Sequence, residues 1–258
     1  MISIKSLNFK YKDRPILKNI SFEAQSGDLI CVLGPNGVGK STLFKCILGL
    51  LKGYEGEVLI NNNNIKNLSR KLIANEIAYI PQSHFPTFNF SVFNVVLMGT
   101  TSHLSITSSP SKKEEDLVNE TLEKLGISHL KNRGYGEISG GERQLVLIAR
   151  ALTQKAKVLI MDEPTANLDY GNQVKVMKKV KELSDEGYTI ILSTHNPEHA
   201  FLYANKVMVI YGGEITNFGV PKDILTEDLL EKIYNVKVSL YDISNNDNML
   251  RICVPLLN

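Results

Sequence analysis

The sequence predicts an α/β fold: a mixed sheet with an antiparallel β subdomain, into which an α-helical subdomain is inserted. Residues 158–161 and 189–193 are short, continuous apolar runs, as expected for parallel strands that are covered on both faces. Residues 1–30 instead alternate between polar and apolar side chains, which is typical of antiparallel strands. Residues 85–153 carry helical periodicity, which distinguishes them from the segments on either side.

The length sets the expected domain organisation. At 258 residues, the chain is large enough for one α/β domain with a smaller subdomain. We therefore expect a single domain, 1–258, in which 1–84 and 154–258 form the core and 85–153 form the helical subdomain. The sequence shows no internal repeat, so this unit is expected once.

The first part of the core is expected to combine strands, turns and one helix. Strands are predicted in "ISIKSLNFKY" (2–11) and "ILKNISFEAQ" (16–25), and a buried strand in "LICVL" (29–33). A glycine-rich loop then leads into a helix in "KSTLFKCILGLL", which Gly53 and Gly56 end. "GEVLINNNNI" is predicted to be a hairpin whose turn is the asparagine run.

Two helices are expected in the helical subdomain before the chain returns to the core. One amphipathic helix is expected in "EEDLVNETLEKLGI". Another is expected to begin in "EISGGERQLVLIAR", with one apolar face made of Leu145, Ile148, Ala149 and Leu152. The core then resumes with the strand "KVLIMDEP", the helix "NQVKVMKKVKELSDEG", the strand "YTIILSTH", a short helix near "NPEHAFLYA" and the hairpin "KVMVIYGGEI". The chain from Gly219 onward is expected to add a helix and a β-rich tail.

Composition limits the classes of protein that the chain can belong to. Basic residues number 29 and acidic residues 27, so the net charge of +2 does not indicate nucleic-acid binding by bulk electrostatics. No apolar run approaches the roughly 18 residues that cross a bilayer, and the alternating start lacks the apolar block of a signal peptide. We therefore expect a cytoplasmic protein that reaches a membrane only through a partner. Cys31, Cys46 and Cys253 form no CxxC pair, so a metal or redox role is not expected.

The loop "GPNGVGKST" matches the pattern G-x-x-x-x-G-K-[ST] between a strand and a helix. Its glycines allow backbone N–H groups to converge on one point, and the following helix adds the positive end of its dipole. Lys40 is expected to reach the β- and γ-phosphates of a nucleotide, and the Ser41 hydroxyl to ligate Mg²⁺. The residues of this predicted nucleotide site are Gly34, Pro35, Asn36, Gly37, Val38, Gly39, Lys40, Ser41 and Thr42.

Polar residues follow the two buried strands of the second half. Asp162 and Glu163 are expected at the carboxyl end of a parallel strand, where such sheets bind ligands. A lone acidic pair is more often a solvated strand end. Beside the phosphate-binding loop at 34–42 (the P-loop), however, we predict that Asp162 holds Mg²⁺ through water and that Glu163 polarises the attacking water. His195, which ends "LSTH", is alone more often structural, but near a γ-phosphate it could hold that water in line. The other four histidines are expected in polar loops or at helix ends, without a functional role.

A second glycine pair opens the helix that begins in "ISGGE". Ser139 and Glu142 fit a capping box, in which each side chain bonds the other residue's backbone N–H. A cap alone leaves Gly140 and Gly141 without an explanation.

Taken in order, the P-loop, "YIPQ", "ISGGERQ", "VLIMDEP", "ANLD" and "STH" resemble the ATP-binding cassette (ABC) ATPases, a P-loop NTPase family, over nearly the whole chain. The resemblance implies that Gln82 links Mg²⁺ and the water to the helical subdomain, that Tyr11 stacks on adenine, and that Asp169 belongs to the nucleotide site. The chain departs from the family pattern at positions 138, 142 and 166, where Ile, Glu and Ala replace the commoner Leu, Gln and Ser. The first two changes preserve shape and capping chemistry.

The resemblance also explains the second glycine pair. In the family, two cassettes face each other head to tail, and each signature helix points its N-terminus at the γ-phosphate held by the other P-loop. Residues 139–142 are therefore expected to complete the site of a second copy, and ATP itself is expected to drive the pairing.

The same resemblance suggests what the ATPase drives. Four phenylalanines follow Gln82, and we expect part of them to build the helical core and the others to line a groove for a membrane permease: Phe85, Phe88, Phe90 and Phe93. "PTFNFSVFNVVLMG", "RQLVLIARAL" and "LDYGNQ" are most similar to ATPase subunits of importers for iron–siderophore, haem, cobalamin and related metal chelates, with oxyanions carried by some relatives. A substrate-binding protein would act upstream, and the ATPase would lie on the inner face of the cell membrane.

The alternative is a soluble ABC ATPase that acts on DNA or ribosomes. DNA-repair members need a long heptad insertion between the P-loop and the signature, and translation members carry two cassettes in one chain; this sequence has neither. A P-loop kinase would leave "ISGGE" and His195 without a reason. The resemblance therefore favours a transport ATPase with no nucleic-acid partner.

Overall fold

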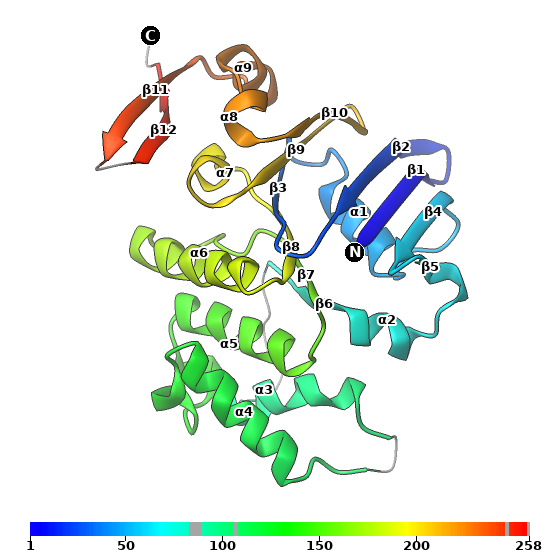
Figure 1. Cartoon of the computed structure of the whole chain (residues 1–258), viewed down its shortest axis with the longest axis vertical. Helices are drawn as coiled ribbons and strands as arrows, with labels where there is room; N and C mark the ends of the chain where they lie inside the picture. Colours follow the sequence, from blue (N-terminus) through cyan, green and yellow to red (C-terminus); the bar gives the residue numbers. More distant parts are fainter. Residues whose placement is uncertain (83–88, 106–107, 246–247, 257–258) are drawn as a thin grey trace.

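A six-stranded sheet forms the centre of the molecule. The computed structural model describes residues 1–82, 89–105, 108–245 and 248–256. The strand order is β10 (Glu214–Gly219), β9 (Lys206–Tyr211), β3 (Leu29–Leu33), β8 (Thr189–Ser193), β7 (Val158–Met161) and β6 (Ile77–Ile80) (Figure 1). β10 runs antiparallel to β9 and all other neighbours are parallel, so the sheet is mixed, as predicted.

The side chains of β3 show why the parallel strands are apolar at every position. Leu29, Cys31 and Leu33 belong to one buried core, whereas Ile30 and Val32 belong to a second core on the other face. Every residue of β3, β7 and β8 is buried. A strand with protein on both faces has no position at which a polar side chain can reach water.

The N-terminal subdomain is the predicted antiparallel sheet. Its order is β2 (Arg14–Ala24), β1 (Ile2–Tyr11), β4 (Glu55–Ile60) and β5 (Asn63–Asn64). The asparagine run forms the turn between β4 and β5, because Asn61 and Asn62 have φ values of 47° and 66°, a conformation that asparagine tolerates well. The predicted hairpin is therefore confirmed.

The helix after the P-loop is shorter than the sequence suggested. α1 spans Lys40–Ile47 and is capped at Leu48, whereas the prediction continued it to Leu51. Gly49, with a φ of 66°, takes the left-handed conformation that ends many helices, so the chain turns before it reaches Gly53.

Helices α3 (Val92–Leu97), α4 (Lys112–Lys124) and α5 (Gly140–Thr153) lie together at one end of the molecule (Figure 1). Ile148, Ala149 and Leu152 are buried in their shared core, and Leu145 is partly buried against it. Phe93 packs against the same core, and Phe90 is 41 % exposed. Phe85 and Phe88 lie outside the described residues.

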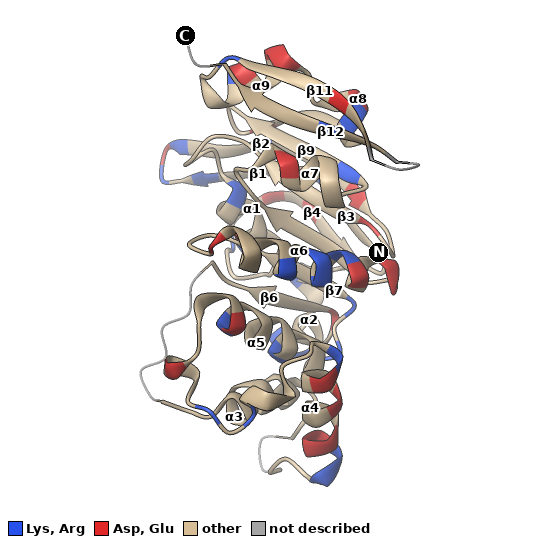
Figure 2. Ribbon diagram, turned by 90° about the vertical axis from the view of Figure 1, so that its left-hand side faces the viewer, with Lys and Arg blue, Asp and Glu red and all other residues tan. Residues whose placement is uncertain are grey.

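Further helices and a hairpin complete the chain. They are α2 (Arg70–Glu76), α6 (Tyr170–Asp185), α7 (Pro197–Tyr203), α8 (Pro221–Ile224), α9 (Glu227–Tyr234), β11 (Val238–Asn245) and β12 (Asn248–Pro255), with short 3-10 turns at Ile65–Asn67, Met98–Ser102, Ser128–Leu130 and Tyr135–Glu137. The predicted C-terminal helix and β-rich tail are thus present. Figure 2 shows the β11–β12 hairpin and α3–α5 at opposite ends of the molecule, and β12 packs along α7.

Candidate functional site

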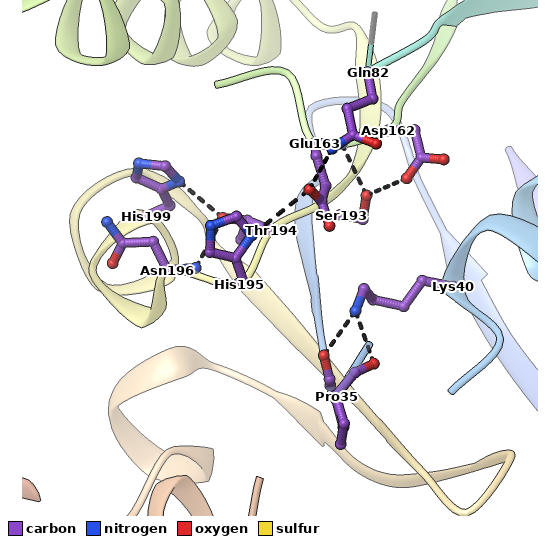
Figure 3. A network of polar contacts seen from close by, with 11 residues as sticks. Pro35, Lys40, Gln82, Asp162, Glu163, Ser193, Thr194, His195, Asn196 and His199 are labelled. Atoms are coloured by element: carbon purple, nitrogen blue, oxygen red, sulfur yellow. Dashed lines mark hydrogen bonds and ion pairs between the residues drawn. The ribbon is translucent and has the colours of Figure 1, made fainter. Parts of the chain in front are cut away.

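The candidate site lies where four neighbouring parallel strands end. The P-loop follows β3, Gln82 follows β6, Asp162 and Glu163 follow β7, and His195 lies two residues after β8. Because the carboxyl ends of parallel strands meet at one edge of a sheet, these side chains converge even though they are far apart in sequence. Figure 3 shows this convergence around Glu163.

The P-loop is shaped by glycines that tolerate no side chain. Gly34 has a φ of 151°, and a Cβ atom there would lie 2.3 Å from the carbonyl oxygen of Ile210. Gly39, with a φ of 115°, is the N-cap of α1 and offers no side-chain cap. The first N–H groups of α1 are therefore not capped by that residue, which suits them to an anion.

Lys40 lies inside the loop, where it is only 6 % exposed. Its Nζ donates to the carbonyl oxygens of Gly34 at 2.7 Å and Pro35 at 3.1 Å. Burial lowers the pKa of Lys40, and the carboxylates of Glu163 and Asp162 act in the opposite direction. These two carboxylates therefore help to keep the ammonium charged.

The loop and the second acid share one pocket. A cavity of about 180 Å³ is lined by Asn36, Gly37, Gly39, Lys40, Ser41, Thr42, Ile16 and Glu163. The structure thus brings most of the predicted P-loop residues to one cavity with Glu163. Val38 is half-buried beside Gly34, where its side chain approaches to 3.1 Å of a Cβ placed there.

The two acidic residues are tied to β8 by one hydroxyl. Ser193 donates to Asp162 Oδ1 at 2.6 Å and accepts from the backbone N–H of Glu163 at 2.9 Å. Glu163 has a φ of 46°, a left-handed conformation that is strained for a residue with a side chain. Tyr79 also hydrogen-bonds Asp162, and burial, reinforced by that carboxylate, raises the pKa of Tyr79 to about 12.

Gln82 and His195 approach the carboxylate of Glu163 (Figure 3). Gln82 donates through Nε2 to Glu163 Oε2 at 2.9 Å. His195 Nδ1 lies 3.7 Å from the same oxygen, which is beyond hydrogen-bond distance. All three border a pocket of about 470 Å³. The arrangement can hold a water molecule between a carboxylate, an amide and an imidazole.

The signature segment is built as a capped helix, as the sequence predicted. Glu142 accepts from the backbone N–H of Ser139 at 2.7 Å, and Ser139 Oγ accepts from that of Glu142 at 3.3 Å. A Cβ at Gly141 would lie 2.5 Å from Asn172 of α6, and one at Gly140 would lie 3.2 Å from Leu168. Close packing against the start of α6 is therefore one reason for both glycines. Among the described residues, 139–142 line neither the cavity of about 180 Å³ at the P-loop nor the pocket of about 470 Å³ beside Gln82 and His195.

The ABC transporter family model matches residues 17–166, which is more than half of the sequence. The chain belongs to this family. It is 38 % identical to an uncharacterized ABC transporter ATP-binding protein of Haemophilus influenzae, over 93 % of this chain and 91 % of the relative. It is 37 % identical to the hemin import ATP-binding protein HmuV of Shewanella denitrificans, over 91 % of this chain and 93 % of that protein.

A solved structure of the same family supports the assignment. It is an ABC transporter of the metal-chelate type in an inward-facing conformation, and its matching subunit superposes with a TM-score of 0.88 at 29 % identity. The match covers 99 % of this chain and 97 % of the other. The protein is therefore an ABC ATPase, and its family binds and hydrolyses ATP. In the part of the chain that the structure describes, no helix has the length and apolarity to span a bilayer.

Among the described residues of this ABC ATPase, Tyr11 and Asp169, which the resemblance places at the nucleotide, line neither of the two pockets that contain Glu163. Tyr11 is 45 % exposed at the end of β1, and its ring meets Phe9 edge-on at 4.8 Å. Asp169 caps α6, accepting from the N–H of Asn172 at 2.8 Å and from its side-chain amide at 2.7 Å. Their contact with nucleotide remains a prediction.

Sequence reasoning missed the buried polar residues behind the site. In the sequence, Ser193 and Thr194 stand out only as part of "LSTH". Parallel pairing of Met161 with Leu192 places the residues at the end of β8 beside those that follow β7. His199 lies in the first turn of α7, in agreement with the expectation of a helix end, but the sequence did not indicate its burial, since it is only 6 % exposed. A histidine at that depth must find a partner for its ring nitrogens, and His199 finds one in Thr194 at 3.0 Å.

Proposed function

We propose that this chain is the ATP-hydrolysing subunit of a membrane importer, and that it dimerises around ATP and Mg²⁺. The observation that carries the proposal is the meeting of Lys40, Asp162 and Glu163 at the carboxyl edge of the central sheet, beside a helix start without a side-chain cap. A cation, two carboxylates and free backbone N–H groups are the parts that phosphoryl transfer needs.

The residues present fit a triphosphate with its metal ion. Among the described residues, the acceptors of Lys40 are the neutral carbonyl groups of Gly34 and Pro35. A phosphate oxygen is a stronger acceptor for an ammonium. Ser41, Asp162 and the amide oxygen of Gln82 are oxygen donors of the kind that Mg²⁺ takes, in a set small enough to leave room for phosphate and water. No group of three or more His, Cys, Asp or Glu that could bind a metal without the nucleotide exists among the described residues. Bound Mg²⁺ would neutralise charge on the phosphates.

Glu163 is the group that we propose to activate water. Its side chain is 17 % exposed, so it is reachable but largely shielded, and Gln82 holds its Oε2. His195, with a side chain that is 63 % exposed, would hold the water in line from the other side. Glu163→Gln should therefore keep ATP binding and lose roughly 10²-fold or more in turnover.

We propose that the second copy supplies residues 139–142. Ser139 and Gly140 are exposed at the start of α5. The neighbours of the two glycines are Leu168, just before α6, and Asn172 on α6. The capping box uses the N–H groups of Ser139 and Glu142. The N–H groups of Gly140 and Gly141 lie outside it, and they are the groups that would receive an anion presented by a partner. One chain then carries two half-sites, and the triphosphate fills the seam between two copies.

The importer assignment rests on similarity to ATPases whose names describe hemin import and to a transporter of the metal-chelate type. We propose an iron–siderophore, haem, cobalamin or related chelate as cargo, delivered by a substrate-binding protein to permease subunits. Phe90, next to α3, would contribute to the surface that receives the permease. The ATPase would then lie on the inner face of the cell membrane.

Affinity purification of the full-length chain from solubilised membranes tests this assignment. We expect a polytopic permease to co-purify in stoichiometric amount. Co-purification of ribosomes or DNA, with no membrane protein, would instead favour the soluble alternative.

A further inference from the structure

The side chain of His195 is mostly exposed, so its own contacts do little to hold it in place. Its side chain is 63 % exposed, and its contact to Glu163 is 3.7 Å long. Side chains that must orient a reacting group need support from residues behind them, because a misplacement of about 1 Å can cost about 10²-fold in rate. Support for His195 therefore has to come through the backbone that carries it.

The residues on both sides of His195 are fixed. Thr194 is 3 % exposed, and its backbone N–H donates to the carbonyl oxygen of Val32 on β3 at 3.2 Å. Asn196 caps α7, because its Oδ1 accepts from the N–H of Glu198 at 2.9 Å. The Thr194 hydroxyl joins these two ends across His195 by accepting from the N–H of Asn196 at 3.1 Å.

His199 completes this arrangement from the interior of α7. Its Nδ1 lies 3.0 Å from Thr194 Oγ1 (Figure 3). Its ring also packs edge-on to Tyr203, with centroids 6.4 Å apart. Burial, with a smaller contribution from His195, lowers the pKa of His199 to about 4. The ring is therefore neutral at pH 7 and can accept a hydrogen bond.

We propose that His199 is a positioning residue for hydrolysis, which fixes the Thr194 hydroxyl and through it the turn that presents His195 to Glu163. The inference rests on the role proposed above for His195. The backbone N–H of Asn196 occupies a lone pair of Thr194 Oγ1, and the hydroxyl proton is directed at Nδ1 of His199. In this proposed arrangement the hydroxyl donates to Nδ1 and the ring carries its proton on Nε2, a tautomer that is part of the proposal. The hydrogen-bonded chain runs from α7 to the turn, while His195 itself remains free to move its side chain toward a ligand.

The test compares removal of each partner with its conservative replacement in the full-length ATPase. Thr194→Val keeps the shape of the side chain and removes the hydroxyl, whereas Thr194→Ser keeps the hydroxyl. His199→Leu removes the acceptor, whereas His199→Asn can place an amide oxygen where the ring has Nδ1. His195→Ala is measured in parallel, together with ATP affinity and melting temperature for every variant.

We expect Thr194→Val and His199→Leu each to lower kcat by roughly tenfold to a hundredfold, with KM for ATP changed by less than about twofold. The double variant should lose little more than either single one, because both break the same connection. Thr194→Ser and His199→Asn should recover most of the lost kcat. A loss that merely reflects a weakened fold would appear as a lower melting temperature without this recovery.

Three results would overturn the inference. One is a kcat within about twofold of wild type in Thr194→Val and His199→Leu while His195→Ala is inactive, which would reject the role of His199 alone. Another is a loss in His199→Asn equal to that in His199→Leu, which would make the residue structural. Full activity of His195→Ala would reject the role proposed for His195 itself, and the positioning role with it.

Discussion

Ser193→Ala should uncouple the acidic pair from β8 and destabilise the fold. Ser193 is completely buried, and its hydroxyl makes a 2.6 Å bond to Asp162 Oδ1 and a 2.9 Å bond from the N–H of Glu163. A hydrogen bond to a charged group contributes about 1.5–3 kcal/mol, and an orphaned N–H costs about 1–3 kcal/mol when it cannot reach water. We expect the two effects to overlap and to lower the free energy of unfolding by about 3 kcal/mol.

Urea denaturation of the wild type and the variant measures this difference. Ser3→Ala is the matched control. Ser3 lies on β1 in the N-terminal antiparallel sheet, is 3 % exposed, and donates to Glu23 of the neighbouring strand β2 at 3.1 Å. The control should lose only about 1 kcal/mol, because Glu23 is exposed and water both weakens this bond and can replace it. Turnover should also fall in Ser193→Ala, because Glu163 would no longer be held in its left-handed conformation. A stability loss no greater than that of Ser3→Ala would refute the coupling.

Two further predictions concern the P-loop and the interior of α7. Gly34→Ala should destabilise more than Gly37→Ala, since strain of about 1–2 kcal/mol is common to both but only at Gly34 would the Cβ meet a backbone oxygen, at 2.3 Å; equal melting temperatures would contradict this. His199 has a pKa of about 4 in the fold against an ordinary 6.5, so its contribution to stability is present above pH 6.5 and is lost as the pH falls toward 4. The wild type should therefore lose about 3 kcal/mol more than His199→Asn between pH 7 and pH 4, and parallel stability curves would count against the buried neutral ring.

The parts of the fold that follow from local chemistry could be predicted from the sequence. Apolar runs gave β7 and β8, the alternating start gave β1 and β2, and Ser139 with Glu142 gave the capped start of α5. The end of α1 was misplaced because the apolar run continues to Leu51, so the prediction ended the helix at Gly53 rather than at Gly49. Only its left-handed φ of 66° shows that it ends the helix.

Only the site residues that belong to recognisable sequence motifs could be predicted. Lys40, Asp162 and Glu163 were found because each has a strand before it and a fixed neighbour pattern. Ser193 and His199 were missed because the partners of Ser193 follow the neighbouring strand β7 and the partner of His199 lies in the turn before α7. Their burial, not their residue type, makes them important. The two glycines of the signature were assigned to a ligand, but the close approach of Asn172 to Gly141 is a packing reason that no local pattern reveals.

The central claim is that the site becomes complete only when two copies pair across ATP. Sedimentation of Glu163→Gln with and without Mg²⁺–ATP tests it, in combination with Ser139→Arg or with Ser111→Arg, which alters the matching capping box on α4. We predict ATP-dependent dimers for Glu163→Gln alone and with Ser111→Arg, and monomers that still bind ATP with Ser139→Arg. Dimers of equal stability in the Ser139→Arg combination would contradict the claim, as would loss of ATP binding by that monomer to the extent seen in Lys40→Ala.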